Sequence, residues 1–235
     1  MKLFIIDSAR YKEYTIALLA DDTAGLMDAL GIPEAHILGI SMGGMIAQEL
    51  AINHPEKVCK LVLCSTSSRW NPSKEGSRIV SAMERGCSLE ELAKAYLTFP
   101  FVHDYPIDYI RRDPTVVNVY TADFVKENMD LVNHYYHRFR QNPPSKEGSK
   151  RQFDAVKECN THGRLHLISA PTLVLHGKKD FVFSPENGSI LAEAIPNARL
   201  VLFKKSAHYL ADEMGAVAKV VTEFLLWLAP RLLRV

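Results

Sequence analysis

The chain has few cysteines, almost no net charge and no long hydrophobic run, and each of these features argues against a class of protein. Its 235 residues include four cysteines, which form neither a CxxC pair nor a metal-ligand spacing. The net charge is +1, with Lys and Arg scattered along the chain, so no basic surface for nucleic acid or an anionic membrane is indicated. No segment approaches the roughly 20 apolar residues of a membrane span.

The remaining composition is typical of a globular domain. Hydrophobic residues make up 47% of the chain and charged residues 23%, which suffices for a substantial core. Cys59 and Cys64 lie in an apolar run and are expected to be buried free thiols, as in a reducing compartment. The apolar stretch in residues 1–7 is too short for a signal peptide. We therefore expect a soluble, cytoplasmic protein.

Residues 1–66 alternate between short apolar runs and segments with helical periodicity. The expected strands are Lys2–Asp7, His36–Ile40 and Val58–Ser65. The expected helices begin at Thr15 and Met42, and a proline at position 55 ends the second. This alternation predicts parallel strands joined by right-handed crossovers.

Residues 67–166 have a different character, with many prolines and aromatic residues and no clear strand, and they predict a helical insertion. The alternation then resumes, with strands expected at 171–176 and 198–203 and helices at 185–195 and 214–228. We predict an α/β protein with three α/β/α layers and a mostly parallel sheet of about five strands. Residues 1–66 and 167–235 would form this core, and residues 67–166 a helical cap.

The sequence Gly39-Ile40-Ser41-Met42-Gly43 joins a predicted strand to a predicted helix. In such a nucleophile elbow the serine occupies a sharp, strained turn, so its neighbours must be small. Gly39 and Gly43 are expected to let the strand and the helix approach, and Gly44 adds room. The helix N-terminus favours negative charge that develops beside Ser41. The alternative is an ordinary glycine-rich turn, as in nucleotide-binding units.

An acid and a histidine follow the serine, each just beyond a predicted strand. A serine hydroxyl needs a base to take its proton, and the base needs an acid to orient it. Because the carboxyl ends of parallel strands share one edge, Ser41, Asp180 and His208 should converge there. The alternative for Asp180 is a simple turn residue. Asp212 and Glu213 are instead expected to cap the last helix.

Two segments resemble proteins of the α/β-hydrolase fold, in particular the esterase, enol-lactonase and C–C hydrolase group. They contain the runs Gly-Ile-Ser-Met-Gly-Gly-Met-Ile-Ala-Gln-Glu-Leu and Ala-Pro-Thr-Leu-Val-Leu-His-Gly-Lys-Lys-Asp. The resemblance implies Ser41 as nucleophile, Asp180 as acid and His208 as base. It implies a serine hydrolase that cleaves a small carboxylic ester or related acyl substrate through an acyl-enzyme and needs no cofactor.

The chain departs from that family near its start. The family has three further strands before the first one seen here, and the loop after the third supplies an oxyanion donor beside a His-Gly motif. We expect this chain to lack them, so the Met42 N–H is the one oxyanion donor that can be placed. One missing donor costs on the order of 10²–10³ in rate. The alternative function is therefore a weak or inactive hydrolase scaffold.

An exposed sheet edge would also follow, because the missing third strand would leave a gap beside the strand His36–Ile40. The strand Lys2–Asp7 is expected to fill this gap by pairing with His36–Ile40, or to pair with another chain. An open apolar edge favours self-association. The expected partners are thus a small acyl substrate and a second copy of the chain.

The predicted cap holds the candidates for substrate binding. Four of its aromatic residues are candidates for an apolar acyl pocket, with packing of the cap on the core as an equal alternative. These residues are Trp70, Phe99, Phe101 and Tyr105. The cap also contains His103, Asp104, His134 and His137. No third ligand has a meaningful spacing to the histidine pair, so no metal site is predicted.

Overall fold

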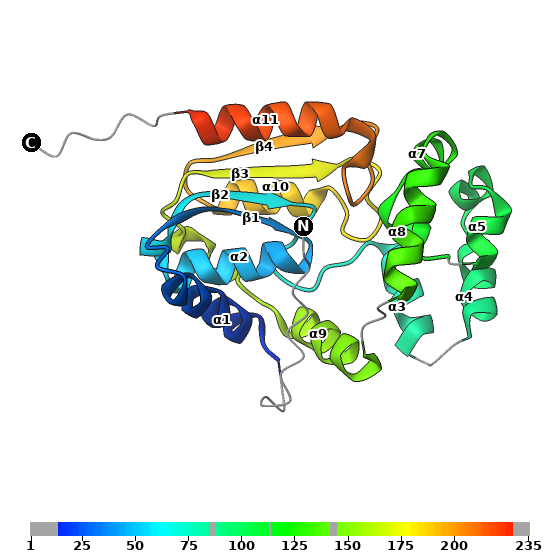
Figure 1. The fold of residues 1–235 in the computed structure, drawn as a ribbon, viewed down its shortest axis with the longest axis horizontal. Helices are drawn as coiled ribbons and strands as arrows, with labels where there is room; N and C mark the ends of the chain where they lie inside the picture. The colour runs from blue at the N-terminus through cyan, green and yellow to red at the C-terminus, as the bar shows by residue number, and fades with distance from the viewer. Residues whose placement is uncertain (1–13, 85–87, 113, 142–144, 228–235) are drawn as a thin grey trace, which may run out of the picture.

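The computed structural model describes residues 14–84, 88–112, 114–141 and 145–227 (Figure 1). In chain order the elements of the first part are α1 (Ile16–Ala29), β1 (Ala35–Ile40), α2 (Met42–Asn53), η1 (Pro55–Lys57) and β2 (Val58–Cys64). The middle part contains α3 (Lys74–Glu84), α4 (Leu89–Tyr96), η2 (Pro100–Asp104), α5 (Ile107–Arg112), α6 (Val116–Val119), α7 (Ala122–Glu127), α8 (Met129–Gln141) and α9 (Lys146–Glu158). The last part contains η3 (His162–Leu167), β3 (Thr172–Gly177), α10 (Glu186–Ala194), β4 (Ala198–Phe203), η4 (Ala211–Glu213) and α11 (Met214–Leu226).

The four described strands form one parallel sheet in the order β1-β2-β3-β4. The predicted α/β class with a parallel sheet is confirmed, and each of these strands begins and ends within one residue of its expected bounds. The additional strand expected at Lys2–Asp7, and its pairing, lie outside the described residues. The last helix ends at Leu226, two residues before the expected end.

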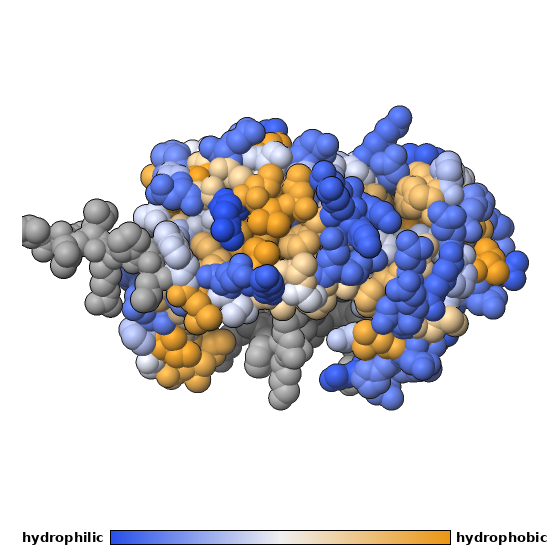
Figure 2. Space-filling view, turned by 90° about the horizontal axis from the view of Figure 1, so that it is seen from above, coloured by the Kyte–Doolittle hydropathy of each residue, from blue (hydrophilic) through white to orange (hydrophobic). Residues whose placement is uncertain are grey.

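Helices cover both faces of the sheet because β2 and β3 alternate between two apolar surfaces. Leu61 and Leu63 of β2 pack with α1, α2 and α10 on one face. Val62 and Cys64 pack with α11 on the other face, which lies uppermost in Figure 1 and is seen from above in Figure 2. Since side chains of a strand point alternately to opposite faces, one apolar run serves both layers.

A buried lysine in β2 is hydrogen-bonded to the end of the last helix. Lys60 is 8% exposed, and its Nζ donates hydrogen bonds to the carbonyls of Phe224 and Leu225 at 2.9 Å each. The last carbonyls of a helix have no N–H donor within the helix, so they need another partner. A cation at this end also complements the helix dipole. These hydrogen bonds satisfy carbonyls at the C-terminus of α11 and accommodate a charged residue in a buried strand.

The segment between β2 and β3 is helical, as predicted. Figure 1 shows α3, α4, α5, α7 and α8 beyond the carboxyl ends of the strands, whereas α9 lies beside the core near α2. The outer helices have apolar clusters of their own, centred on residues such as Tyr96, Ile110 and Val125. Within the described residues, no helix combines the length and the apolar character needed to cross a membrane.

The chain enters and leaves this helical segment side by side. Arg69 and Asn160 form an antiparallel bridge, and the Thr161 N–H donates to the carbonyl of Ser68 at 2.7 Å. The Thr161 hydroxyl donates to Oε1 of Gln48, a fully buried residue of α2, also at 2.7 Å. The junction is therefore hydrogen-bonded to the helix that follows the predicted nucleophile.

Candidate active site

Ser41 occupies the sharp turn between β1 and α2. Its backbone angles are φ 54° and ψ −122°, in a region that non-glycine residues rarely adopt. The Ser41 N–H donates to the carbonyl of Cys64 at 3.0 Å, and the Thr66 hydroxyl donates to the Ser41 carbonyl at 2.7 Å. These bonds tie the turn to the end of β2 and hold the strained conformation in place.

The glycines around Ser41 have unequal roles. A Cβ on Gly39 would lie 2.2 Å from the carbonyl oxygen of Gly43, and a Cβ on Gly44 would lie 2.6 Å from the Thr66 side chain. Both positions therefore require glycine, as expected. The same expectation is wrong for Gly43, where a Cβ would meet nothing within 4 Å. The close approach involves the backbone of Gly43 and not the space where its side chain would be.

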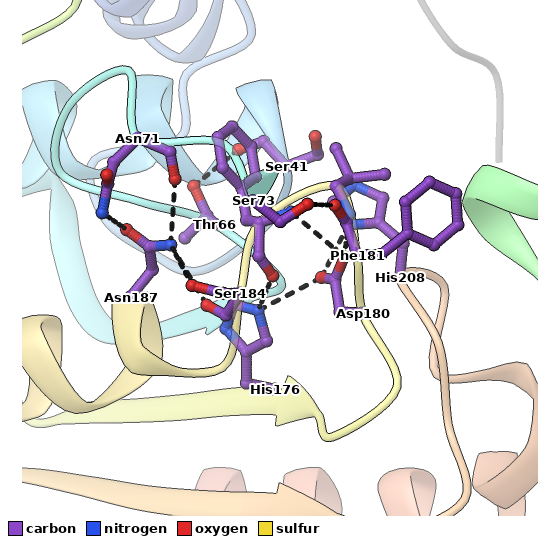
Figure 3. Close-up of polar contacts among 12 residues, drawn as sticks. Ser41, Thr66, Asn71, Ser73, His176, Asp180, Phe181, Ser184, Asn187 and His208 are labelled. Atoms are coloured by element: carbon purple, nitrogen blue, oxygen red, sulfur yellow. Dashed lines mark hydrogen bonds and ion pairs between the residues drawn. The ribbon is translucent and has the colours of Figure 1, made fainter. Parts of the chain in front are cut away.

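Asp180 and His208 meet at the same edge of the sheet, beyond β3 and β4. His208 Nδ1 lies 2.8 Å from Asp180 Oδ2, and both residues are 4% exposed (Figure 3). The other carboxylate oxygen, Oδ1, accepts hydrogen bonds from the N–H groups of Val182 at 2.9 Å and Phe183 at 3.1 Å. A second imidazole, that of His176, lies 3.1 Å from Oδ2.

These contacts keep Asp180 ionised despite its burial. Burial by itself raises the pKa of this carboxyl group. The charge of His208 and the hydrogen bonds from His176 and His208 outweigh burial, so the pKa of Asp180 lies below its ordinary value. An ionised, fully hydrogen-bonded carboxylate is suited to orient an imidazole and to stabilise its cation.

The loops that carry Asp180 and His208 are joined to each other. Lys179 N–H donates to the carbonyl of Ser206 at 3.0 Å, and a Cβ on Gly177 would lie 2.3 Å from that carbonyl oxygen. Glu213 accepts hydrogen bonds from the N–H of Lys205 at 2.8 Å and from the Ser206 hydroxyl at 3.0 Å. Glu213 occupies the N-cap position of α11, as predicted, but its carboxylate makes no capping hydrogen bond because the loop before His208 engages it.

Asp212 likewise has a different role from the predicted helix cap. It accepts a hydrogen bond from the hydroxyl of Thr121, which precedes α7. In the same loop, the Tyr209 N–H donates to the carbonyl of Val119 at 3.2 Å. The rings of Tyr209 and Tyr120 pack edge to face with centroids 5.8 Å apart. The helical segment thus contacts the loop of His208 directly, immediately beyond the histidine.

Ser41 and His208 do not form a hydrogen bond with each other in this structure, in which both residues are described (Figure 3). Such bonds are often long before substrate binds. Met42 is the first residue of α2, and the first N–H groups of a helix have no acceptor within it. The predicted oxyanion donor is thus placed next to the predicted nucleophile in a region of positive helix dipole.

Two of the predicted substrate-binding residues contact the loop that follows Asp180. The ring of Trp70 lies edge to face with that of Phe183 at 5.9 Å, and Phe183 lies 6.1 Å from the His208 ring. Phe101 lies 5.3 Å from the ring of Phe181 and is 37% exposed. Trp70 is therefore one aromatic ring away from His208, and Phe101 contacts the residue that follows Asp180 in the chain.

The other two predicted substrate-binding residues pack within the helical segment. Phe99 is 4% exposed and belongs to the cluster around Tyr96. The hydroxyl of Tyr105 donates to the carbonyl of Tyr120 at 2.6 Å, and burial is the main reason that the pKa of Tyr105 lies far above its ordinary value. The histidine pair His134 and His137 is exposed on α8. Among the described residues, no three potential metal ligands come together.

Three residues of the site had not been identified from the sequence: Thr66, His176 and Glu213. Thr66 contacts Ser41 across 25 positions of the chain. The contacts of His176 with Asp180 and of Glu213 with Lys205 span only four and eight positions, but they depend on the path of the turns and not on a local sequence pattern. His176 did have one signal, since it is a polar residue in a strand that is otherwise apolar.

Comparison with known proteins identifies the family to which the chain belongs. The family model Hydrolase_4, described as serine aminopeptidase, S33, matches residues 15–215. The 3-oxoadipate enol-lactonase 2 of Acinetobacter baylyi is 28% identical over 194 residues, which are 82% of this chain and 64% of that protein. The 2-hydroxy-6-oxononadienedioate/2-hydroxy-6-oxononatrienedioate hydrolase of Burkholderia vietnamiensis is 30% identical over 214 residues, which are 86% of this chain and 66% of that protein.

The solved structures give the same result. The crystal structure of the enol-lactonase from Burkholderia xenovorans LB400 matches with a TM-score of 0.72 and 28% identity, over 93% of this chain and 76% of that chain. The chain spans less than two thirds of the length of the two sequence relatives above, both of which are hydrolases. The elbow, the strand order and these matches together show that the chain belongs to the serine aminopeptidase S33 family of α/β-hydrolase fold proteins.

Proposed function

We propose that the chain is a serine hydrolase that cleaves a small carboxylic ester or a related acyl substrate. The observation that carries this proposal is the 2.8 Å contact between His208 Nδ1 and Asp180 Oδ2, at the sheet edge where the elbow presents Ser41. An enol-lactonase among the relatives supports acyl chemistry, because a lactone is a cyclic ester.

In the first half of the reaction, Ser41 Oγ would bond to the substrate carbonyl carbon while its proton passes to His208 Nε2. The carbonyl oxygen becomes an oxyanion, and the Met42 N–H would donate to it. Asp180 accepts the Nδ1–H of His208 and stabilises the imidazolium. When the tetrahedral intermediate collapses, the bond to the leaving alkoxide breaks, and the alkoxide takes the proton from His208.

In the second half, water attacks the acyl-enzyme and gives its proton to His208. The bond between Ser41 Oγ and the acyl carbon then breaks, Ser41 recovers its proton, and the carboxylic acid leaves. Each group thus returns to its starting state, and no cofactor is consumed.

For the acyl group we propose an apolar wall formed by Trp70 and Phe101. This is supported by their ring contacts with Phe183 and Phe181, which flank the loop of Asp180. Binding sites of this kind combine apolar walls with a few polar groups that orient the ligand. Phe99 and Tyr105 would pack within the cap and not contact the acyl group directly.

The second candidate is a weak or inactive hydrolase scaffold that self-associates through β1. Within the described residues β1 pairs with β2 alone, and Leu38 of β1 is 48% exposed. An unpaired apolar edge is a template for another strand. Light scattering after size-exclusion chromatography would give the mass of a single chain if this candidate is wrong.

The decisive test is turnover of p-nitrophenyl acetate by the wild type and by Ser41→Ala, with Ser77→Ala, on the exposed side of α3, as the matched control. We expect Ser41→Ala to lose activity by at least about 10³-fold and Ser77→Ala to retain it. A fluorophosphonate probe should label Ser41, identified by peptide mass spectrometry. Equal rates for the wild type and Ser41→Ala would exclude the serine hydrolase.

A further inference from the structure

A second histidine contacts the carboxylate that orients His208. His176 is the penultimate residue of β3 and is fully buried. Its Nε2 lies 3.1 Å from Asp180 Oδ2 and 2.9 Å from the carbonyl oxygen of Phe183 (Figure 3). An ionised carboxylate and a carbonyl are both acceptors only, so Nε2 must carry a hydrogen, which is bonded to the Phe183 carbonyl and lies beside Asp180 Oδ2.

The other ring nitrogen of His176 defines the protonation state. Nδ1 is buried and has no hydrogen-bond partner among the described residues. It faces Gly188 of α10, where an added Cβ would lie 3.2 Å from Nδ1. A hydrogen on Nδ1 would be a buried donor without an acceptor, and in the imidazolium it would also carry charge. The contacts therefore favour a hydrogen on Nε2.

This donor completes the set around Asp180. The backbone N–H groups of Val182 and Phe183 donate to Oδ1, His208 is hydrogen-bonded to Oδ2, and His176 Nε2 lies 3.1 Å from the same oxygen. Rotation of the carboxylate would break bonds on both oxygens at once. Unlike His208, which lies on a loop, His176 belongs to the central part of the sheet, with β3 between β2 and β4. The contact with His176 therefore links Oδ2 to a strand that is paired on both sides.

We propose that His176 is a positioning residue, whose Nε2–H donates to Asp180 and sets the orientation in which the carboxylate holds His208. Its effect on rate rests on the proposed serine hydrolase function, whereas its hydrogen bond to Asp180 does not. His176 itself touches neither the substrate nor Ser41 in this role.

The kinetic test compares His176→Met, which removes the donor, with His176→Gln, whose side-chain amide can place an N–H near the former Nε2. Outer hydrogen-bonding partners of functional groups typically contribute about 10- to 100-fold. We expect kcat for p-nitrophenyl acetate to fall by this factor in His176→Met with little change in KM, and to recover in His176→Gln. His162→Met is the matched control, since His162 is exposed on η3. Equal kcat in His176→Met and the wild type would overturn the proposal.

The second test does not depend on activity. In ¹⁵N-labelled wild type, NMR of the imidazole groups should show His176 with its hydrogen on Nε2 and a bare Nδ1. The hydrogen-bonded Nδ1–H signal of His208 should shift in His176→Met and return toward its wild-type position in His176→Gln. A His176 Nε2 without a hydrogen in the wild type would overturn the proposal. If the wild type does not hydrolyse esters, the proposed function fails, and this NMR result alone decides the role of His176.

Discussion

The glycines of the elbow allow a matched pair of substitutions with opposite expected signs. In Gly39→Ala the new Cβ would lie 2.2 Å from the Gly43 carbonyl oxygen, 2.6 Å from its carbonyl carbon and 2.7 Å from Gly44 Cα. All three are backbone atoms, so no side-chain rotation relieves the overlap. The start of α2 must move away from β1 by about 1 Å, at a cost of about 3 kcal/mol.

Gly43→Ala adds the same methyl group where nothing lies within 4 Å. Because alanine is better than glycine inside a helix by about 1 kcal/mol, this variant should be more stable than the wild type. For a domain of this size, 1 kcal/mol corresponds to roughly 2–4 °C in Tm. We therefore expect Gly39→Ala to lower Tm by about 6–12 °C and Gly43→Ala to raise it by about 2–4 °C.

Thermal unfolding followed by circular dichroism measures both changes. Labelling of Ser41 by a fluorophosphonate adds a functional readout, since a displacement of about 1 Å at a reacting group costs on the order of 10²-fold in rate. The reasoning is refuted if Gly39→Ala melts at the wild-type temperature, or if the two variants are destabilised equally.

Two further predictions concern Ser41 and Asp180. Because Ser41 has φ 54°, Ser41→Gly should relieve backbone strain that Ser41→Ala retains, and urea denaturation should show the glycine variant to be more stable by about 1 kcal/mol. At Ser77, inside helix α3, the same two substitutions should have the opposite order, and the same order at both sites would contradict the strain. The pKa of Asp180 is lower in the folded chain than in the unfolded chain, so the unfolded state binds the extra proton and this stabilisation is lost as pH falls. The difference in unfolding free energy between the wild type and Asp180→Asn should therefore be constant from about pH 7 to pH 5 and shrink below about pH 4. A difference that stays the same down to pH 3 would show that Asp180 is not held as the anion.

The strands and the order of the site residues follow from local pattern. The apolar run of β2, the proline after α2 and the glycine-flanked Ser41 each act within a few residues, so their structural effect is visible in the sequence. Asp180 and His208 were expected at one edge because parallel strands place their carboxyl ends together. That expectation requires only the order of elements along the chain.

The tertiary structure decided what depends on how the chain folds back on itself, even between residues that are only a few positions apart. Sequence pattern could not separate Gly39 from Gly43, because the clash depends on how closely α2 approaches β1. Glu213 is the N-cap residue of α11, as expected, but its carboxylate accepts hydrogen bonds from the loop before His208, an outcome set by the path of that loop. His176 was seen only as the end of a strand, and its contact with Asp180 forms when the chain turns back after β3.

The sequence by itself therefore determined the alternation of strands and helices, the elbow at Ser41 and the order of serine, acid and histidine. These depend on period, on backbone restrictions and on chain direction, which are local properties. Only the tertiary structure decided which groups surround Asp180, which glycines are indispensable and which aromatic rings face the site. Those outcomes depend on how strands, turns and loops pack in three dimensions, including between residues only four positions apart, and close packing leaves little freedom once the layers have met.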